Sequence, residues 1–317
     1  MSIYPYLEKI TLEQAKYINE FNLDKNIQFI EVNCPICFSS KQKKLFDNDR
    51  YNLRCKICLC LNCGLVFSKM QMDEKSLNYF YENYYRKIYE QNYDLNKYRE
   101  KLINFDFNYS NNPNFNDYSN SLFFEFINSH NLDYDSVFEI GTGMGVNLLY
   151  FKQINKKVSG IEPDENCVNI LKDFIPDIKQ GFLENIKKSS DLIILRHVLE
   201  HLSDPIKSLK IISKFSNKYL FIEVPGSIKY LQSVQNAHNL FFTPNTLNNL
   251  IVNNGFELLS LEVCKENDFI FALYKKQKNT IKFKYDFKIE VNKSKKMFYF
   301  MMFKYYIKRI LKILKLR

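Results

Sequence analysis

The residues with the clearest chemical purpose are two acids and three glycines that follow apolar runs of the chain. The run VFE ends in Glu139 and leads into alternating glycines, Gly141, Gly143 and Gly145, before a helical pattern begins. Glycines are needed where a loop takes backbone angles that other residues avoid and where a ligand touches the main chain. The next apolar run ends in Glu162, at a spacing suited to accepting hydrogen bonds from a ribose diol. The pattern predicts a strand, a ligand-binding loop and a helix N-terminus.

Histidines supply a further chemical signal. The chain has four, and three lie in two short blocks: His197 and His201 in HVLEHLSDP, and His238 in HNLFFTP. Histidine can accept a proton at neutral pH. His197 directly follows the apolar run DLIILR, and active-site residues of open α/β sheets collect where strands end. We expect His197 to be the general base; Glu200 and His201 begin the next helix, where capping and packing are an equal explanation.

Alternating strands and helices must position these groups. The apolar runs before Glu139, Glu162 and His197 are each followed by a polar or glycine-containing turn, and helical patterns lie between them. Together these blocks resemble the S-adenosylmethionine (SAM) site of a class I methyltransferase, over about residues 133–275. The resemblance implies an α/β fold, with a Rossmann-like class I methyltransferase sheet.

The resemblance also implies the roles of individual residues. Glu139 and the glycine loop would surround the methionine part of SAM, and Glu162 would hold the ribose hydroxyls. Phe182 and Leu183 stand where the family packs the adenine, although the acid often found nearby is replaced by Gln180 and Gly181. The cofactor-binding residues expected on this basis are Glu139, Gly141, Thr142, Gly143, Gly145, Glu162, Pro163, Phe182, Leu183 and Arg196.

The transfer of a methyl group from a sulfonium is an in-line displacement, so the enzyme chiefly aligns the acceptor and removes its proton. The expected catalytic residues are His197, His201 and His238. Methyltransferases that act on the 3′-terminal ribose of small RNAs carry Glu-x-x-Glu-His here, with a distant histidine, and bind a divalent metal. This chain is similar, but His197 replaces the first acid, so a metal-assisted RNA ribose methyltransferase is an alternative hypothesis.

Six of the eight cysteines fall within 30 residues, as three C-x-x-C pairs. Such pairs hold zinc more often than they form disulfides in a reducing cytosol. Two ligand sets have suitable spacing: the first pair with Cys55 and Cys58, or the first pair with the last. We favour the last pair because Gly64 follows it and permits a turn that points backbone N–H groups at the sulfurs. The predicted ligands are Cys34, Cys37, Cys60 and Cys63.

The run CLNCGLVF resembles the second knuckle of the zinc ribbons that precede many sugar-modifying methyltransferases. The zinc is expected to be structural, because four thiolates leave no open coordination position. The resemblance implies methylation of a sugar or nucleotide-sugar, on oxygen rather than carbon, in surface glycan biosynthesis. The other class of hypothesis is a nonenzymatic zinc-ribbon binding module with a degenerate SAM fold. No nucleic-acid partner is expected, since the ribbon's basic residues are interleaved with acids.

The predicted organisation has four parts. They are a zinc ribbon region (1–70), a helical connector or cap (71–131), the SAM-binding methyltransferase domain (132–277) and a basic amphipathic tail (278–317). In the related enzymes the connector packs over the cofactor cleft, so its tyrosines face SAM or the acceptor or pack between helices. The tyrosines concerned are Tyr79, Tyr84, Tyr85 and Tyr89.

The positive charge is concentrated in the tail. Residues 278–317 carry 13 Lys or Arg and two acids, so the net charge of +10 leaves a nearly neutral enzyme body. Apolar residues such as Phe300, Phe303 and Ile307 recur there at helical spacing, with lysines on other faces. This pattern predicts binding to an anionic membrane surface, or docking against protein. The N-terminus lacks a secretory pattern, so we expect a cytoplasmic protein, peripheral at the inner face of the membrane if the tail binds there.

Overall fold

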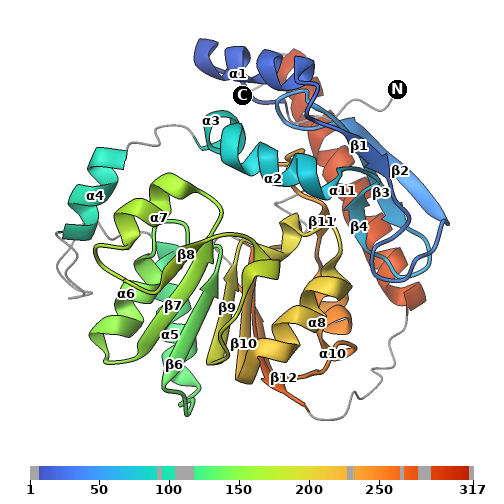
Figure 1. Cartoon of the computed structure of the whole chain (residues 1–317). Coiled ribbons are helices and arrows are strands. Elements are labelled where there is room, and N and C mark those ends of the chain that lie inside the picture. The colour runs from blue at the N-terminus through green and yellow to red at the C-terminus, as the bar shows by residue number, and fades with distance from the viewer. Residues whose placement is uncertain are drawn as a thin grey trace.

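A seven-stranded sheet forms the centre of the computed structural model, which describes residues 7–90, 95–103, 118–226, 231, 233–264, 268–277 and 287–313. The strand order is β12-β13-β10-β9-β6-β7-β8 (Figure 1). Strands β8, β7, β6, β9 and β10 are parallel to one another, whereas β13 is antiparallel to both β10 and β12. The bounds are β6 Ser136–Ile140, β7 Lys157–Glu162, β8 Ile178–Gln180, β9 Ser190–Arg196, β10 Ser216–Pro225, β12 Phe256–Val263 and β13 Phe269–Lys276.

Helices cover both faces of this sheet, which explains why its central strands are apolar throughout. In β9, Leu192 and Ile194 face one hydrophobic core while Ile193 and Leu195 face the other. Side chains alternate across a strand, so a strand buried on both faces reads as an unbroken apolar run. Helices of the first core are α5 Tyr118–Ser129, α6 Val146–Gln153 and α7 Glu165–Leu171; those of the second are α8 Pro205–Phe215 and α10 Pro244–Val252. The predicted α/β, Rossmann-like fold is confirmed.

The N-terminal cysteines lie in, or in turns next to, a separate four-stranded sheet with the order β11-β4-β3-β2. Its strands are β2 Gln42–Asn48, β3 Arg54–Cys60, β4 Val66–Ser68 and β11 Leu240–Phe241. Strand β11 follows β10 in the chain and pairs antiparallel with β4. A segment from the methyltransferase half therefore completes the sheet of the ribbon. A two-stranded sheet joins β1 Phe29–Glu31 to β5 Met70–Met72.

Helices α2 Glu74–Asn83 and α3 Tyr85–Tyr89 of the connector lie above the carboxyl ends of the parallel strands (Figure 1). Helix α4 Leu95–Ile103 lies beside α7 instead, and α1 Leu12–Leu23, which precedes the ribbon, packs beside α3. Asp73 caps α2 by accepting a hydrogen bond from the backbone N–H of Ser76 at 2.8 Å. Phe21 of α1 and Phe80 of α2 meet edge to face, with ring centroids 5.3 Å apart. The helical part of the predicted connector thus forms an aromatic layer, and residues 104–117 lie outside the described part.

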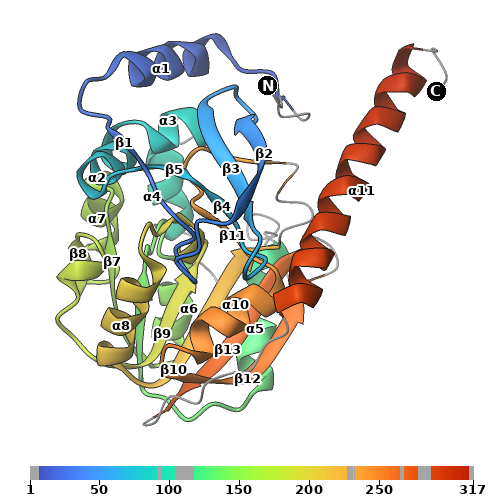
Figure 2. The ribbon, with the colours of Figure 1, turned by 90° about the vertical axis from the view of Figure 1, so that its right-hand side faces the viewer.

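The C-terminal helix α11, Phe287–Ile313, packs on the ribbon by its first half only. Ser294 donates a hydrogen bond from Oγ to the carbonyl of Gly64 at 3.0 Å, and Met301 is buried against the ribbon core. Beyond Met302 the helix projects away from the body (Figure 2). Residues 278–286 and 314–317 of the predicted tail lie outside the described part. Among the helices of the described ranges, none has the length and apolar character needed to cross a bilayer.

Candidate functional site

The glycine loop between β6 and α6 has the backbone conformation that its sequence demands. Gly141, Gly143 and Gly145 have φ angles of 69°, 50° and 70°, which non-glycine residues rarely adopt. A Cβ atom on Gly145 would lie 2.3 Å from Leu171 Cδ2, so this glycine lets the loop approach α7. A Cβ atom on Gly143 would meet nothing within 4 Å. Gly143 therefore borders open space, where a ligand can lie against the main chain.

Glu162, at the end of β7, bonds to the backbone of the glycine loop. Its carboxylate accepts hydrogen bonds from the backbone N–H of Gly143 at 2.8 Å and of Asp164 at 3.2 Å. Burial raises the pKa of Glu162, and the Arg86 guanidinium, 3.6 Å away, opposes that rise. Arg86 belongs to α3 and also pairs with Asp164 at 2.6 Å. The ion pair between Arg86 and Glu162, the predicted ribose-binding acid, thus joins the connector to the glycine loop.

Glu139 is buried at the end of β6 behind the loop. Its Oε1 accepts a hydrogen bond from Asn147 Nδ2 at 2.6 Å, whereas its Oε2 has no hydrogen-bond partner among the described residues. Burial raises the pKa of Glu139 to about 8. An unsatisfied buried carboxyl oxygen is costly, and an ammonium group would satisfy it.

A cavity of about 530 Å³ opens at the carboxyl ends of β6, β7 and β9. Several of the predicted cofactor residues line it, together with two of the three predicted catalytic histidines. The predicted site residues that line the cavity are Gly141, Gly143, Glu162, Pro163, Phe182, Leu183, Arg196, His197 and His201. Glu139, Thr142, Gly145 and His238 do not line it; Thr142 and Gly145 support the loop, and His238 is buried behind His201.

His197 lies between two carboxylates at the end of β9. Its Nε2 is 3.1 Å from Glu223 Oε1 and its Nδ1 is 3.6 Å from Glu200 Oε1. Burial alone would lower its pKa, but the two carboxylates outweigh burial and raise it to about 9. Arg196 also forms an ion pair with Glu223. Burial alone would raise the pKa of Glu223, but the charges of Arg196 and His197 outweigh burial and lower it to about 2. The imidazolium form of His197 therefore predominates at neutral pH.

His201, by contrast, has a lowered pKa. His201 belongs to the 3-10 turn Leu199–His201, which stands where a helix start was expected; α8 begins only at Pro205, after the Asp204 cap. Burial lowers the pKa of His201, so its ring is neutral at pH 7. Its Nδ1 is 2.6 Å from the hydroxyl of Tyr81 and 3.1 Å from the carbonyl of Ala237.

Ligand-type atoms of Glu200, His201 and His238 lie within 4.8 Å of one another. Glu200 is almost fully buried, and neither of its carboxylate oxygens has a hydrogen-bond partner among the described residues. One carboxylate with two imidazoles is a donor set that suits a divalent transition metal. The structure thus brings together three of the four residues considered for a metal-assisted mechanism, and His197 points instead to the space between Glu200 and Glu223.

The connector supplies cavity residues that the sequence analysis did not single out. Tyr81 and Arg86 line the cavity together with Tyr85, which was among the tyrosines considered. Tyr81 and Tyr85 are four residues apart, so they lie on one face of consecutive helical turns. That spacing is the signal that could have found Tyr81. The hydroxyls of Tyr84 and Tyr89 bond elsewhere, to Asp24 and Asp49.

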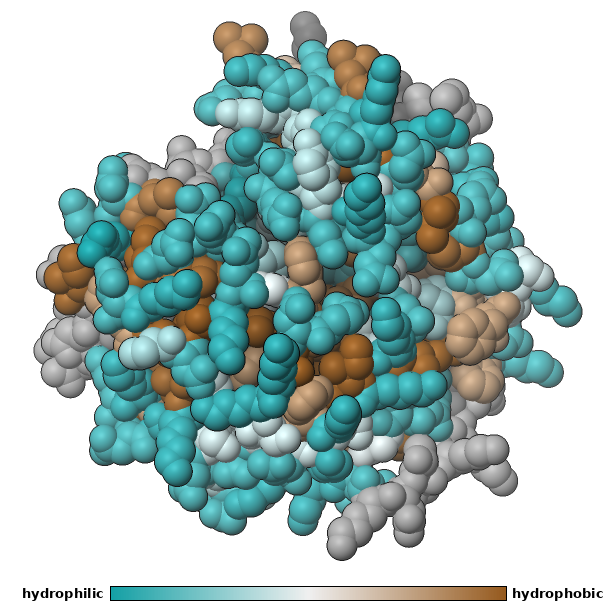
Figure 3. All heavy atoms as spheres, viewed as in Figure 1, coloured by the Kyte–Doolittle hydropathy of each residue, from teal (hydrophilic) through white to brown (hydrophobic). Residues whose placement is uncertain are grey.

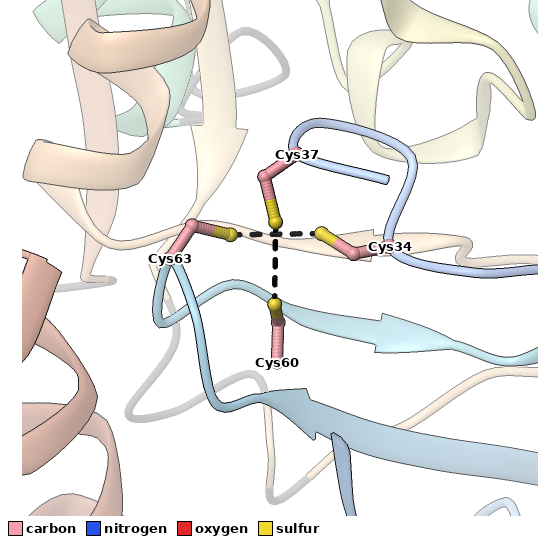
Figure 4. Close-up of side chains that lie close together, drawn as sticks. All are labelled: Cys34, Cys37, Cys60 and Cys63. Carbon is pink, nitrogen blue, oxygen red and sulfur yellow. Dashed lines mark hydrogen bonds between the residues drawn. The ribbon is translucent and has the colours of Figure 1, made fainter. Parts of the chain in front are cut away.

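The cysteine cluster forms in the ribbon as predicted. The sulfurs of Cys34 and Cys63 are 3.5 Å apart, as are those of Cys37 and Cys60, and all four converge on one point (Figure 4). A tetrahedral zinc with bonds of about 2.3 Å would place its sulfurs about 3.8 Å apart, so the cluster fits the ion. Gly64 has a φ of 80°, as the expected turn requires.

The alternative pair does not join this cluster. Cys55 and Cys58 lie on β3, where their thiols are buried in hydrophobic cores. Burial raises the pKa of Cys58 to about 11 and that of Cys55 well above its usual value. The convergence of the four sulfurs therefore favours the predicted set.

A direct chain of hydrogen bonds runs from the ribbon to the histidine turn. The backbone N–H of Ser68, on β4, donates to the carbonyl of Asn239 at 2.9 Å. Asn239 donates in turn from its backbone to the carbonyl of Glu200 at 2.8 Å and from its side chain to that of His201 at 2.7 Å. The ribbon therefore positions one wall of the cavity.

The sequence model of a protein family described as methyltransferase domain matches residues 92–261. The chain belongs to this family. The match covers the glycine loop, both acids and all three predicted histidines. The protein is a SAM-dependent methyltransferase with a Rossmann-like sheet, as the sequence analysis expected. No curated protein sequence matches the chain.

Solved methyltransferase structures resemble about half of this methyltransferase. A SAM-dependent methyltransferase from Archaeoglobus fulgidus is 18% identical, with a TM-score of 0.43, over 50% of this chain and 93% of that one. The magnesium protoporphyrin IX methyltransferase of Synechocystis PCC 6803 is 13% identical, with a TM-score of 0.43, over 50% and 81%. The 1,6-didemethyltoxoflavin-N1-methyltransferase of Burkholderia thailandensis is 14% identical, with a TM-score of 0.40, over 48% and 76%.

The residues of the site fit SAM. Gly143 leaves room beside the loop, and behind the loop Glu139 Oε2 has no hydrogen-bond partner among the described residues. The bound cofactor supplies an electrophilic methyl group on a sulfonium. The protein's own part in the reaction is to orient the two ligands and exclude water.

Proposed function

We propose that this enzyme methylates a hydroxyl group of a sugar or nucleotide-sugar, in the assembly of a surface glycan. The supporting observation is the character of the cavity beyond the cofactor residues, where the rings of Tyr81 and Tyr85 lie beside Asn78, Glu74 and Glu90. Aromatic faces suit the C–H face of a sugar ring, while carboxylates and amides suit its hydroxyls. The resemblance of the ribbon to those of sugar-modifying methyltransferases supports the same acceptor class.

In this proposal the cofactor end is formed by the predicted residues. Glu139 balances the ammonium group, the backbone of the glycine loop contacts the methionine part, and Glu162 accepts hydrogen bonds from the ribose hydroxyls. Phe182 and Leu183, at the start of the 3-10 turn Leu183–Asn185, pack against the adenine. Thr142, Gly145, Pro163 and Arg196 shape the loop and its surroundings.

The test is product analysis. Purified enzyme is incubated with SAM and a panel of nucleotide-sugars, and products are read by mass spectrometry for a gain of one methyl group. Permethylation analysis then separates O-methyl from C-methyl products. Methylation on carbon, or of a porphyrin or other nonsugar acceptor only, would contradict the proposal. Calorimetry with SAM alone checks cofactor binding independently.

We further propose that the four clustered cysteines hold a structural zinc. The four clustered sulfurs would complete a tetrahedral shell around zinc and leave no position for a substrate. Zinc would fix the two knuckles that precede β2 and β4, a region too small to build a core of its own. Its contribution would be folding energy, transmitted to the histidine turn through β4 and Asn239.

A metal-assisted hydroxyl methylation is the second candidate, supported by the cluster of Glu200, His201 and His238. A divalent metal there would lower the pKa of an acceptor hydroxyl instead of a general base removing the proton. Turnover that stops on adding a mild chelator, resumes with Mn²⁺ or Co²⁺, and leaves the ribbon zinc in place would favour this candidate. Turnover that ignores the chelator would remove it.

The projecting half of α11 supports our proposal of a membrane surface as a partner of this cytoplasmic enzyme. Large apolar side chains are exposed along it, including Phe300, Phe303 and Ile310 with 54%, 61% and 54% exposure. No acidic residue follows Glu290, while nine Lys or Arg do. By contrast, the face in Figure 3 is mainly hydrophilic, with apolar side chains in small groups. An apolar and basic helix suits anionic lipid, and glycan precursors at the inner leaflet would lie near it.

Vesicle sedimentation tests the membrane proposal. The truncation should remove residues 303–317 and keep Met297, Phe298 and Met301, because these pack against the ribbon core. The full chain is expected to sediment with anionic vesicles at low salt, and the truncated chain to stay in the supernatant. Full-length protein that ignores such vesicles would show that the stripe serves a protein contact.

A further inference from the structure

A continuous row of hydrogen-bonded side chains joins Glu139, behind the glycine loop, to His197 in the cavity. Asn147 of α6 donates from Nδ2 to Glu139 Oε1 at 2.6 Å and accepts at Oδ1 from Arg196 Nη1 at 2.7 Å. Arg196 donates from Nε to Glu223 Oε2, and Glu223 Oε1 lies 3.1 Å from His197 Nε2. The row therefore connects the predicted cofactor acid to a side chain that lines the cavity.

The middle of the row is buried, and its hydrogen bonds fit in one direction only. Glu223 is fully buried, and Asn147 is buried as well. Turning the Asn147 amide over would set its Nδ2 against the Arg196 guanidinium, which only donates, and its Oδ1 against the Glu139 carboxyl group. Arg196 also lies over the Phe123 ring, with Cζ 4.5 Å from the ring centroid. A displacement at one end of such a closely packed row is therefore passed to the other end.

The Glu139 end of the row is incomplete. Its Oε2 is buried and has no hydrogen-bond partner among the described residues, although Oε1 of the same carboxyl group bonds to Asn147. A buried polar atom without a partner is costly, so a donor that reaches Oε2 would bind there and reorient the carboxyl group. The ammonium group of SAM is such a donor in the proposed cofactor placement.

The His197 end is held in place by Glu223. His197 has a φ of 54°, in the left-handed region that residues other than glycine seldom adopt, and such strain persists only where neighbouring groups hold it. Its backbone N–H donates to the Glu223 carbonyl at 2.9 Å, and its ring contacts the Glu223 carboxylate. The ring is also edge-on to Phe269, with centroids 4.7 Å apart, and 38% of the side chain is exposed. A shift of Glu223 would therefore turn the imidazole within the cavity.

We infer that Asn147, Arg196 and Glu223 are positioning residues that couple the amino group of the bound cofactor to the orientation of His197. The coupling rests on the proposed cofactor placement, with the ammonium group at Glu139. It works through hydrogen-bond geometry and needs no change of charge in the row. The acceptor end of the cavity is then set only after SAM has bound, so the cofactor precedes the acceptor.

A pair of cofactor analogues tests the coupling without any acceptor. S-adenosylhomocysteine (SAH) keeps the amino group, whereas 5′-methylthioadenosine (MTA) has the same adenosine and thioether sulfur but lacks the amino acid part. Proton signals of the His197 ring are read in protein with carbon-13-labelled histidine and assigned with His197→Gln, because the nearby Phe269 ring makes them sensitive to orientation. We expect saturating SAH to shift them and saturating MTA to leave them nearly as in the free enzyme. Equal shifts with both ligands, or none, would overturn the coupling, since a direct contact with the sulfur end acts in both.

Asn147→Ala breaks the row and is the decisive variant. Saturating SAH should then shift the His197 signals no more than MTA does in the wild type. Asn128→Ala is the matched control and should keep the full response, because Asn128 Nδ2 also donates at 2.6 Å to a residue of α6, the Tyr150 hydroxyl, outside the row. Glu223→Gln leaves one acceptor oxygen for two donors, so it should also lose the response and replaces Asn147→Ala if that variant does not fold. A full response in either folded variant would overturn the coupling.

Calorimetry separates the coupling from the cofactor placement on which it rests. The wild type should bind SAH roughly 10- to 100-fold more tightly than MTA, and Glu139→Gln should lose most of this preference, because a carboxylate bonds an ammonium group more strongly than an amide does. A preference that survives in Glu139→Gln would overturn the placement and the coupling together. A preference that is lost, with Asn147→Ala still giving the full histidine response, would overturn the coupling alone. Neither measurement depends on whether the acceptor is a sugar.

Discussion

The two ends of the cavity are built in different ways. The proposed cofactor end comes from three neighbouring parallel strands, β6, β7 and β9, and from backbone N–H groups at their carboxyl ends. The proposed acceptor end comes from side chains of α2 and α3, which lie opposite the histidine turn and are far from it in sequence. The first end depends on short motifs within one sheet. The second depends on contacts between the connector, the ribbon and the sheet.

Asp49 shows how strongly the acceptor end relies on distant contacts. This buried carboxylate, in the turn between β2 and β3, accepts hydrogen bonds from the Tyr89 hydroxyl at 2.6 Å and the Asn236 backbone N–H at 3.0 Å. It also accepts from the backbone of Tyr51 and Leu53 in its own turn. One ribbon residue thus joins α3 to the segment that leads into β11. Changes in the ribbon should therefore disturb the acceptor end and spare the cofactor end.

The largest expected effect is that of zinc loss, which should affect the two ends of the cavity differently. Cys60→Ala should release the metal and unfold the ribbon, because a structural zinc contributes on the order of 10 kcal/mol to the fold of a small domain. Turnover should be lost while the sheet keeps part of its affinity for SAM. Metal analysis, thermal unfolding and SAM calorimetry measure these effects. Cys58→Ala, two residues away on β3, is the control and should retain zinc.

The second effect belongs to the cofactor end. Glu162→Gln should weaken SAM binding by roughly 2–4 kcal/mol, because it weakens two charge-assisted hydrogen bonds to the ribose. Zinc content should stay the same. Calorimetry gives the affinity, and the exposed Glu165, changed to Gln, serves as the control. An unchanged affinity would exclude Glu162 from the cofactor site.

A smaller effect tests the link between ribbon and histidine turn. Asn239→Ala should cost about 1–3 kcal/mol of stability, since it leaves the buried carbonyl of His201 without its donor. It should lower kcat more than SAM affinity. Asn254→Ala removes a similar bond, to the carbonyl of Leu250, far from the cavity. If the two variants lose kcat equally, the link does not position the turn.

The smallest effect is a pH dependence of stability from His197. Its folded pKa of about 9 exceeds the unfolded value of 6.5, so its pairing stabilises the fold fully below pH 6.5. That contribution declines as pH rises through 9. The stability difference between wild type and His197→Gln should therefore shrink from pH 6 to pH 10 in thermal or denaturant unfolding. A difference that is constant over this range would show that His197 does not change its charge.

Local motifs explain what the sequence could predict. Gly141 to Gly145, Glu162 and the four clustered cysteines lie within short stretches of sequence, so their spacing alone indicates their geometry. Tyr81 and Arg86 act through partners about 80 to 120 residues away, and no periodic pattern shows such a pairing. The charge of His197 was hidden in part, because it depends on Glu200 three residues away and also on Glu223 of β10, 26 residues away. Strand β11 is only two residues long, too short for a recognisable alternation.

The late position of β11 in the chain has a consequence during protein synthesis. The cysteines leave the ribosome early, but β11 can pair with β4 only after about residue 240 has emerged. The hydrogen bond from Ser294 of α11 to the carbonyl of Gly64 forms later still. A nascent ribbon can gather its metal while its sheet still has an open edge and an exposed apolar face. Zinc supply at that moment would decide how much newly made protein escapes aggregation.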